Sequence, residues 1–370
     1  MTPKLAAIAG IGSVSPYGVL AGLIPQSPVE PESITAWPTA GLRRAFLVKP
    51  FRPASVVPGL KTRRLDRLSA WALVASSLAL QDAAIDLNQV DRSRVAVVFA
   101  TGLGCVELTE AFWQSAAANG WRGTDPSPFP EGLTNAPASH VALWHGLRGP
   151  NITAGSRGVA GECALIQAAS LLRHGQADLA IVLAGDTLTR SVYEYYEVAG
   201  LLSPACFNAQ PLREDDGDGS VPGFVPSEGV TALVLEPAGR RAVRSYAHFN
   251  SGRWAAAGQP VETFRQMLGG SLPTLTICAG SGAPCASGSA AALAREISGA
   301  SAAIVPPQAV ATGLTDAGAL LHLILALSSR PRTGPALLVG SSGPTTSGSG
   351  TFDSGASGDG GFAALLLELP

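Results

Sequence analysis

Short apolar runs alternate with stretches of helical periodicity along most of this 370-residue chain. Uninterrupted runs rich in Val, Ile, Leu and Ala are typical of strands that a sheet buries on both faces. We expect such strands at residues 5–11, 95–100, 179–184, 230–235, 275–278, 336–339 and 362–367. Strands of this kind with helices between them favour a layered α/β architecture with parallel pairing.

Helical spacing of apolar residues is clearest over 64–85, where Leu65, Leu68, Ala72 and Ala79 fall on one face. A second helix is predicted from residue 158 to His174, where Gly175 provides a C-cap. Residues 128–145 form a further segment between strands, and 289–297 and 320–328 are helical candidates.

Composition limits the classes of partner. Apolar residues make up 46% of the chain, the formal charge is −2 and the pI is near 6.2, so nothing indicates nucleic-acid binding. Only 14% of residues are charged, which favours a surface partly covered by a partner. The apolar runs are far too short for a membrane span, and no leader pattern precedes the first strand, so we expect a cytoplasmic protein.

Five cysteines, an odd number without CxxC spacing, argue against a disulfide framework and a zinc site, and we expect no metal or cofactor. The 43 Gly and 28 Pro residues indicate many tight turns. We interpret 340–361 as a flexible hairpin. We interpret 215–219 as a solvated turn, because the glutamate that closes a calcium loop is missing. A boundary is expected at 236/237, giving halves 1–236 and a shortened 237–370.

Residues 149–158 indicate a buried strand, a glycine-containing turn and the start of a helix. Such an elbow suits a nucleophile, because the side chain projects at a sharp turn and the helix N-terminus favours negative charge. The position where a nucleophile is expected holds Gly158.

Several segments in order resemble the β-ketoacyl–acyl carrier protein synthases. They are AIAGIGSVSPYG at 7–18, RRLDR at 63–67, TGLG at 101–104, Asn135 and His140 before GLRGP at 146–150, and SEG at 227–229. Together the matches extend from residue 7 to about 327. The resemblance implies a thiolase-like α/β fold, in which two pseudo-duplicated βαβαβ halves form a five-layer α-β-α-β-α sandwich.

The resemblance also implies which residues should do chemistry. The family's cysteine aligns with Gly158, the histidine of its TGH segment with Leu314, and the lysine five residues earlier with Ala309. No histidine lies between His248 and His322, where the other family histidine belongs. Condensation needs a thiolate for the acyl chain and imidazoles to stabilise an enolate. The chain therefore supplies no catalytic residue at any of these positions.

Other residues offer weak substitutes. Cys163 points about 140° away from position 158 around the helix axis. Ser156 has no evident activating partner, and Cys278 and Cys285 fit structural thiols. We expect His140 and His145 to make buried or interfacial hydrogen bonds.

The chain resembles the chain-length factors, or ketosynthase-β subunits, of type II polyketide synthases. The resemblance implies no activity alone, a heterodimer with a catalytic ketosynthase-α subunit, and an acyl carrier protein bound mainly through that partner. The better-known aromatic systems have glutamine at the cysteine position. The glycine and the lost histidines favour the more divergent aryl-polyene-like branch.

By the same resemblance, one strand pairs across the two-fold axis, and a loop and helix start enter the partner's acyl tunnel. The strand residues are Asn151, Ile152, Thr153, Ala154 and Gly155, and the tunnel residues are Pro128, Phe129, Leu133, Ala136 and Pro137. Phe129 and Leu133 would form the tunnel floor; ordinary interface packing is the alternative. Arg240, Arg241 and Arg244 fit either a carrier-protein site or a solvated basic face.

Three other functions remain open. A decarboxylase that primes chains from malonyl carrier protein would need the histidines, and Leu314 argues against it. A solitary binding protein could use the inherited pocket. An active synthase with relocated chemistry would be acylated itself.

Overall fold

In the computed structural model the chain folds into two halves with the same strand order. The structure describes residues 5–25, 27–37, 41–155, 158–208, 223–239, 245–256, 260–268, 273, 275–279, 293–298, 303–305, 311, 314, 317–329, 334–341 and 361–369. Predictions for 215–219, for Arg240, Arg241 and Arg244, for Ser156, Cys285 and Ala309, and for most of 340–361 lie outside these residues.

The first half-sheet has the order β6–β5–β7–β8–β1. Its strands are β1 (Ala6–Ser15), β5 (Val95–Ala100), β6 (Asn151–Ala154), β7 (Leu179–Asp186) and β8 (Gly229–Pro237). β5 pairs in parallel with β6 and β7, and β8 runs antiparallel to β7 and β1. The predicted strands in this half are confirmed.

The second half-sheet has the order β11–β10–β12–β13–β9. Its strands are β9 (Ala247–Ala256), β10 (Leu275–Ala279), β11 (Ala303–Val305), β12 (Gly334–Ser341) and β13 (Gly361–Leu369). In both halves the third strand lies at one end, followed by the second, fourth, fifth and first. β1 and β9 pair antiparallel and join the halves. The repeated order is what a duplicated unit produces, and the 236/237 boundary stays a prediction.

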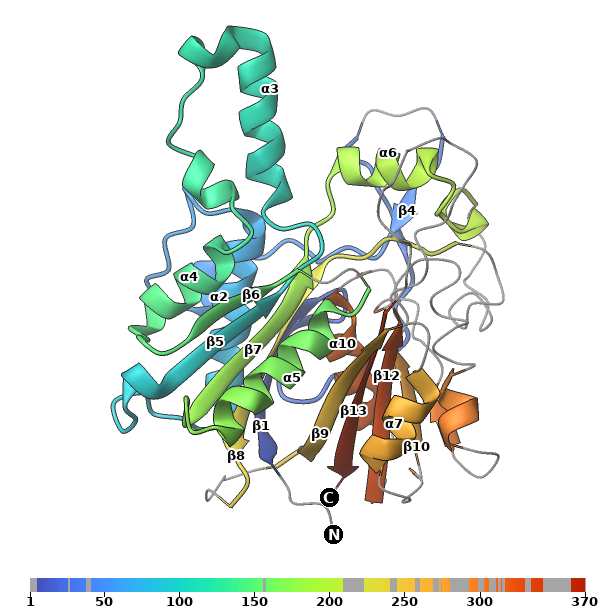
Figure 1. The fold of residues 1–370 in the computed structure, drawn as a ribbon. Helices are drawn as coiled ribbons and strands as arrows, with labels where there is room; N and C mark the ends of the chain where they lie inside the picture. The colour runs from blue at the N-terminus through green and yellow to red at the C-terminus, as the bar shows by residue number, and fades with distance from the viewer. Residues whose placement is uncertain are drawn as a thin grey trace.

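Helices form three layers around these half-sheets (Figure 1). α2 (Arg67–Asp82) covers β1, β7 and β8, and α4 (Ala136–His145) packs beside it. α5 (Ala160–Arg173) and α10 (Ala319–Ser329) touch each other between the halves, and α5 contacts strands of both. α7 (Pro260–Leu268) packs on β9 and β13. This is the predicted five-layer arrangement.

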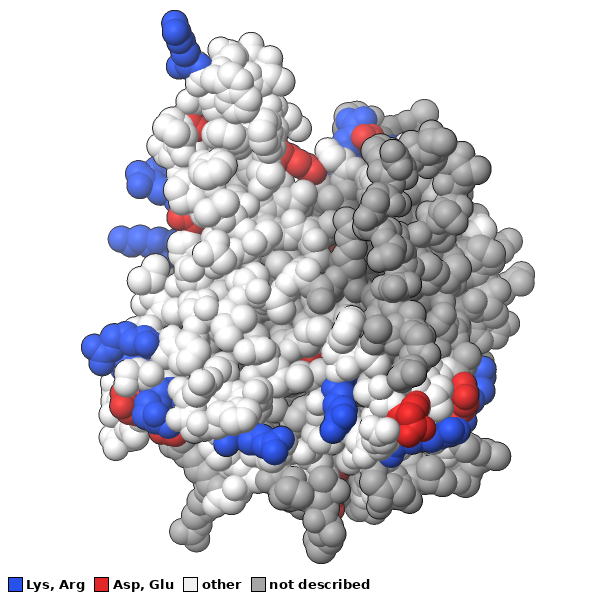
Figure 2. Space-filling model, viewed as in Figure 1, with Lys and Arg blue, Asp and Glu red and all other residues white. Residues whose placement is uncertain are grey.

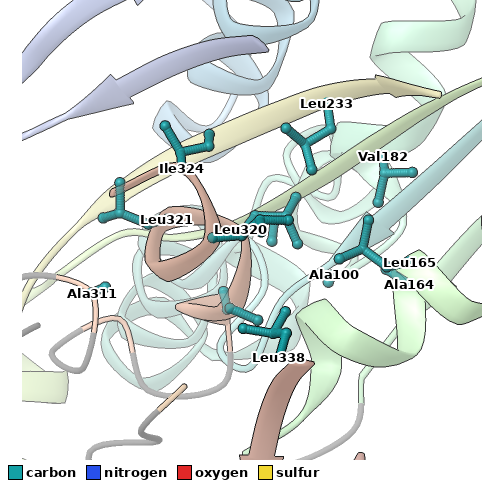
Figure 3. Packing of buried hydrophobic residues seen from close by; sticks show 14 of the residues in the cluster. Ala100, Ala164, Leu165, Val182, Leu233, Ala311, Leu320, Leu321, Ile324 and Leu338 are labelled. Carbon is teal, nitrogen blue, oxygen red and sulfur yellow. The ribbon is translucent and has the colours of Figure 1, made fainter. Parts of the chain in front are cut away.

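Alternate residues of β5 point to opposite faces of the sheet and belong to two different hydrophobic clusters. Ala96, Val98 and Ala100 belong to the central cluster with α5 and α10, whereas Val97 and Phe99 belong to the cluster under α2. Figure 3 shows the central cluster, in which residues of α5, α10 and β8 meet.

Two glycines let α2 lie directly on β1. A Cβ atom at Gly10 or Gly12 would lie 2.2 Å from the backbone oxygen of Ala79 or Ala75, respectively. Glycine is therefore needed at both positions for the helix to pack this closely.

α3 (Val106–Gly123) departs from this layered plan. Figure 1 shows the helix standing away from the sheets, and Ala116 is its only buried residue. The short helix η2 (Phe129–Gly132) follows it. We call α3 and η2, residues 106–132, the arm.

The hydrophobic pattern does not predict α3, α6 (Arg190–Val198), α7, β9 or β11. Residues 293–298 are helical and overlap the helix expected at 289–297. The remaining elements are β2 (Gly18–Ala21), β3 (Glu32–Ser33), β4 (Arg44–Ala45), α1 (Pro53–Val56), η1 (Arg92–Arg94) and η3 (Pro204–Cys206). No helix in the described parts of the chain is both long and apolar enough to cross a membrane.

Candidate functional site

The predicted elbow exists, and its apex is bare. β6 ends at Ala154, and α5 begins at Ala160 with Val159 as an N-cap that contributes no side-chain hydrogen bond. Gly158 has φ +77°, in the left-handed region. L-residues with a side chain rarely adopt this conformation, so the backbone at the apex suits glycine. The apex of the elbow at Gly158 therefore presents no side chain.

The N-terminal ends of α5 and α10 meet behind this elbow. A Cβ atom at Gly161 would lie 2.8 Å from the Cβ of Ala319 and 3.3 Å from Cδ1 of Leu320. Leu314 precedes α10, in a turn in which its N–H donates to the Ala311 oxygen. Its side chain is 2% exposed and belongs to the central apolar cluster. Where the family resemblance implies an imidazole, the structure places a buried leucine.

β6 lies at one end of the sheet, and in the described residues it pairs only with β5. Asn151 and Gly155 are exposed, whereas Ile152, Thr153 and Ala154 are partly buried. Asn151 Nδ2 donates to the Ala138 oxygen at 3.2 Å, which ties the strand to α4. An open edge of this kind can pair with another strand.

The predicted tunnel residues separate into an exposed and a buried set. Phe129 and Leu133 are 53% and 44% exposed, and Pro128 is partly exposed. Ala136 and Pro137 are buried in the first turn of α4. Of the five predicted tunnel residues, Phe129 and Leu133 are therefore the large apolar side chains that are exposed in this chain.

Further aromatic residues surround Phe129 on the arm. Its ring lies 5.5 Å from that of Phe112, which contacts Trp113, and Trp113 contacts Trp121. Both tryptophans are more than half exposed. Figure 2 shows that the face below the arm is mostly uncharged, with Lys and Arg concentrated along the lower rim and one margin. Exposed aromatic clusters such as the one on the arm mark interaction surfaces.

Residues 27–240 match the family Beta-ketoacyl synthase, N-terminal domain, over more than half of the chain. The chain belongs to the β-ketoacyl synthase family. Its relatives include 3-oxoacyl-(acyl-carrier-protein) synthase 2 of Vibrio cholerae, 26% identical over 246 residues, which are 64% of this chain and 58% of that protein. Synthase I of Arabidopsis thaliana chloroplasts is 27% identical over 63% of this chain and 51% of its own length. The chain thus spans little more than half the length of these relatives.

Solved structures establish the thiolase-like fold over the whole chain. The ishigamide ketosynthase/chain length factor has a TM-score of 0.72 at 22% identity and covers 99% of both chains. A type II polyketide synthase acyl-carrier protein in complex with its ketosynthase bound to the hexaketide has a TM-score of 0.72 at 17% identity, with full coverage of both chains.

Among the described residues of this β-ketoacyl synthase family member, no buried thiol fits the role of the missing nucleophile. Burial raises the pKa of Cys278 to about 12, and burial likewise raises the pKa of Cys105 and of Cys206 to about 12. These groups remain protonated at neutral pH, whereas the thiolate is the nucleophile. Cys163 is partly exposed on α5.

The α4 histidines lie on the outer side of the sheet, away from α5. His140 Nε2 contacts the Glu131 carboxylate, and His145 Nε2 lies 3.1 Å from Ser76 Oγ. Burial, with a smaller contribution from Arg92, lowers the pKa of His145 to about 4. Their expected hydrogen bonding is confirmed.

The sequence analysis does not identify two ionisable side chains that lie near the elbow. Glu162 in the first turn of α5 and His322 in the first turn of α10 are each 1% exposed. Both take part in polar or electrostatic interactions within the protein. A single ionisable residue inside an apolar helical run is the signal that could have indicated them. The described residues contain no group of three or more His, Cys, Asp or Glu arranged to hold a metal ion.

Proposed function

We propose that this chain is a non-catalytic chain-length factor that pairs with an active β-ketoacyl synthase and shapes its acyl tunnel. The observation that carries the proposal is the elbow: this family member has a strand, a turn and a helix there, with Gly158 at φ +77° at the position that the family resemblance assigns to the nucleophile. Leu314, which is buried in apolar surroundings, is a second observation that supports a non-catalytic role. Enolate stabilisation needs hydrogen-bond donors aimed at the developing charge, and leucine has none.

The edge strand β6 supports a paired state. Its exposed residues Asn151 and Gly155 and its open edge can accept an antiparallel strand from a partner across a two-fold axis. The name of one structural neighbour, a ketosynthase/chain length factor, states such a partnership. We propose the same arrangement here, with the aryl-polyene-like branch as the finer assignment.

Phe129 and Leu133 are suited to limit a tunnel in that partner. Both are large, apolar and about half exposed, and the short helix η2 and the start of α4 hold them at the side of the arm. A side chain that is exposed in one subunit becomes buried when it enters a cavity of the other, and the apolar surface removed from water stabilises the pair. The acyl chain would stop at these two residues.

A carrier protein would deliver the growing chain to the partner. The structural neighbour that contains an acyl-carrier protein holds it with its ketosynthase. Because this chain has no thiolate at its elbow, the acyl group would pass to the catalytic subunit and never to Gly158.

Replacing Phe129 or Leu133 by alanine tests the tunnel role. In a reconstituted pair with an active synthase, each variant is expected to lengthen the product, because a smaller side chain leaves room for further extension units. Product size is measured by mass spectrometry. Phe207→Ala and Leu23→Ala are matched controls, since these residues are 44% and 43% exposed on other surfaces. An unchanged product distribution with an intact pair would contradict the tunnel role.

A further inference from the structure

The base of the arm is held mainly by polar contacts. α3 buries only Ala116, so apolar packing contributes little to its position. Its first turns are instead bound by side chains of two other parts of the chain: Asp66 and Arg67 at the start of α2, and Thr189.

Arg67 lies at the centre of these contacts. Its Nη2 atom is 2.7 Å from Glu107 Oε1 on α3, and its Nη1 atom is 3.0 Å from Glu228 Oε2 beside β8. Nη2 also donates to the Leu188 oxygen at 2.9 Å, and the guanidinium lies 5.0 Å from the centre of the Trp71 ring. A planar guanidinium with several fixed donors can bridge carboxylates on separate elements in this way.

Neighbouring groups complete the attachment. Asp66 accepts the Leu108 N–H at 3.1 Å, and Thr189 Oγ1 donates to Glu110 Oε1 at 2.7 Å. Glu228 is 2% exposed and also accepts the backbone N–H groups of Val48 and Leu188. Four carboxylates therefore converge on the arm base, and Arg67 is the cation that faces them.

The arm in turn carries η2. Thr109 Oγ1 donates to the Gly132 oxygen at 3.0 Å, and the Phe112 ring packs against Phe129. A change in the angle of α3 therefore moves Phe129 with it.

We propose that Arg67 is a positioning residue, which fixes the arm against the body and thereby sets the location of Phe129 and the length of the product. The first part of the proposal, that Arg67 fixes the arm against the body, concerns this chain alone. The link to product length rests on the proposed function.

Arg67→Met tests the first part in the purified full-length chain. Methionine keeps much of the apolar length over Trp71 and removes the charge, so the carboxylates at the base repel one another. Amide hydrogen exchange in α3 is expected to accelerate about tenfold or more, the effect of losing charge-assisted hydrogen bonds. Arg94→Met removes a comparable ion pair, Arg94–Asp178, at the far end of β5 and is expected to leave α3 unchanged.

Removing the charge of a carboxylate that faces Arg67 distinguishes a positioning role of Arg67 from a role in packing alone. In Arg67→Met with Glu107→Gln the repulsion falls, so protection of α3 is expected to return in part; a purely packing role for Arg67 predicts no such rescue. Arg67→Lys keeps the charge but loses the forked geometry of the guanidinium. Amide exchange in α3 is therefore expected to be intermediate between that of the unmodified chain and that of Arg67→Met. Should Arg67→Met fail to fold, Arg67→Lys and Glu107→Gln alone provide the comparison. Unchanged exchange in α3 in these variants would overturn the inference.

Product analysis tests the second part. Arg67→Met in the reconstituted pair is expected to broaden the product distribution toward longer chains, which is also the expected effect of Phe129→Ala. Faster exchange in α3 with unchanged products would overturn the link to length. If Phe129→Ala itself leaves products unchanged, the proposed function fails, while the exchange result still decides whether Arg67 positions the arm.

Discussion

At the scale of single residues, the site combines retained geometry with absent chemistry. Asp66 of the RRLDR segment caps α2 by accepting the Leu68 N–H, and Asp186 accepts the N–H groups of Gly102 and Leu103, which holds the TGLG turn. These family segments keep their structural roles. The family resemblance aligns Gly158 and Leu314 with residues that react, and neither Gly158 nor Leu314 can take part in acyl transfer.

Restoring a cysteine at the elbow is expected to fail. Gly158→Cys forces a side chain into φ +77°, which should lower the free energy of unfolding by roughly 1–2 kcal/mol. The new thiol should stay unacylated, because Leu314 stands where the family resemblance implies an imidazole. Urea denaturation and a labelled acyl carrier protein measure the two effects.

Gly59→Cys is the matched control, since Gly59 has φ +83° with no heavy atom within 4 Å of an added Cβ. It should lose similar stability without acylation. Acylation of Gly158→Cys at a rate near that of an active synthase would show that the catalytic machinery is intact after all.

At the scale of elements, buried polar contacts fix how the helices sit on the sheet. His145 on α4 reaches Ser76 on α2, and the Arg92 guanidinium donates to the His145 oxygen. The ring is neutral in the folded protein because burial lowers its pKa from 6.5 to about 4. This contact joins the two helices that cover the outer face of β5 and its neighbours.

This histidine makes stability depend on pH. Since the unfolded chain binds a proton at the ordinary histidine pKa, the stability that the neutral ring contributes is complete above pH 6.5 and falls until about pH 4. The pKa difference corresponds to a loss of about 3 kcal/mol. His145→Gln should remove this part of the pH dependence of urea unfolding, whereas His174→Gln, at an exposed position, should keep it. Equal slopes for both variants between pH 6.5 and 4 would refute the assignment.

The sequence pattern predicts the buried elements better than the exposed ones. β5 and β7 are buried along their whole length, so their uninterrupted apolar runs identify them. α3 is missed because Trp113 and Trp121 face outward, and β9 because Asn250, Gly252 and Arg253 interrupt its apolar residues. The sequence pattern predicts the elbow, and the family resemblance aligns its cysteine with Gly158. The Arg67 contacts join residues far apart in the chain, which only the fold brings together.

At the scale of the whole molecule, the chain has the full layered fold of its family and surfaces that suit a second subunit. An open sheet edge, an aromatic arm and an uncharged face lie on one side of the molecule (Figures 1 and 2), whereas the apex of the elbow between the halves is Gly158. This division of roles is what a subunit needs if it acts through the active site of its partner.

The intact mass of each subunit tests this claim most directly. The chain is co-purified with an active β-ketoacyl synthase and the complex is incubated with a labelled acyl carrier protein. The account predicts a 1:1 complex in which the partner alone gains the acyl mass. An acyl group on this chain, or the absence of a complex with any co-expressed synthase, would contradict it.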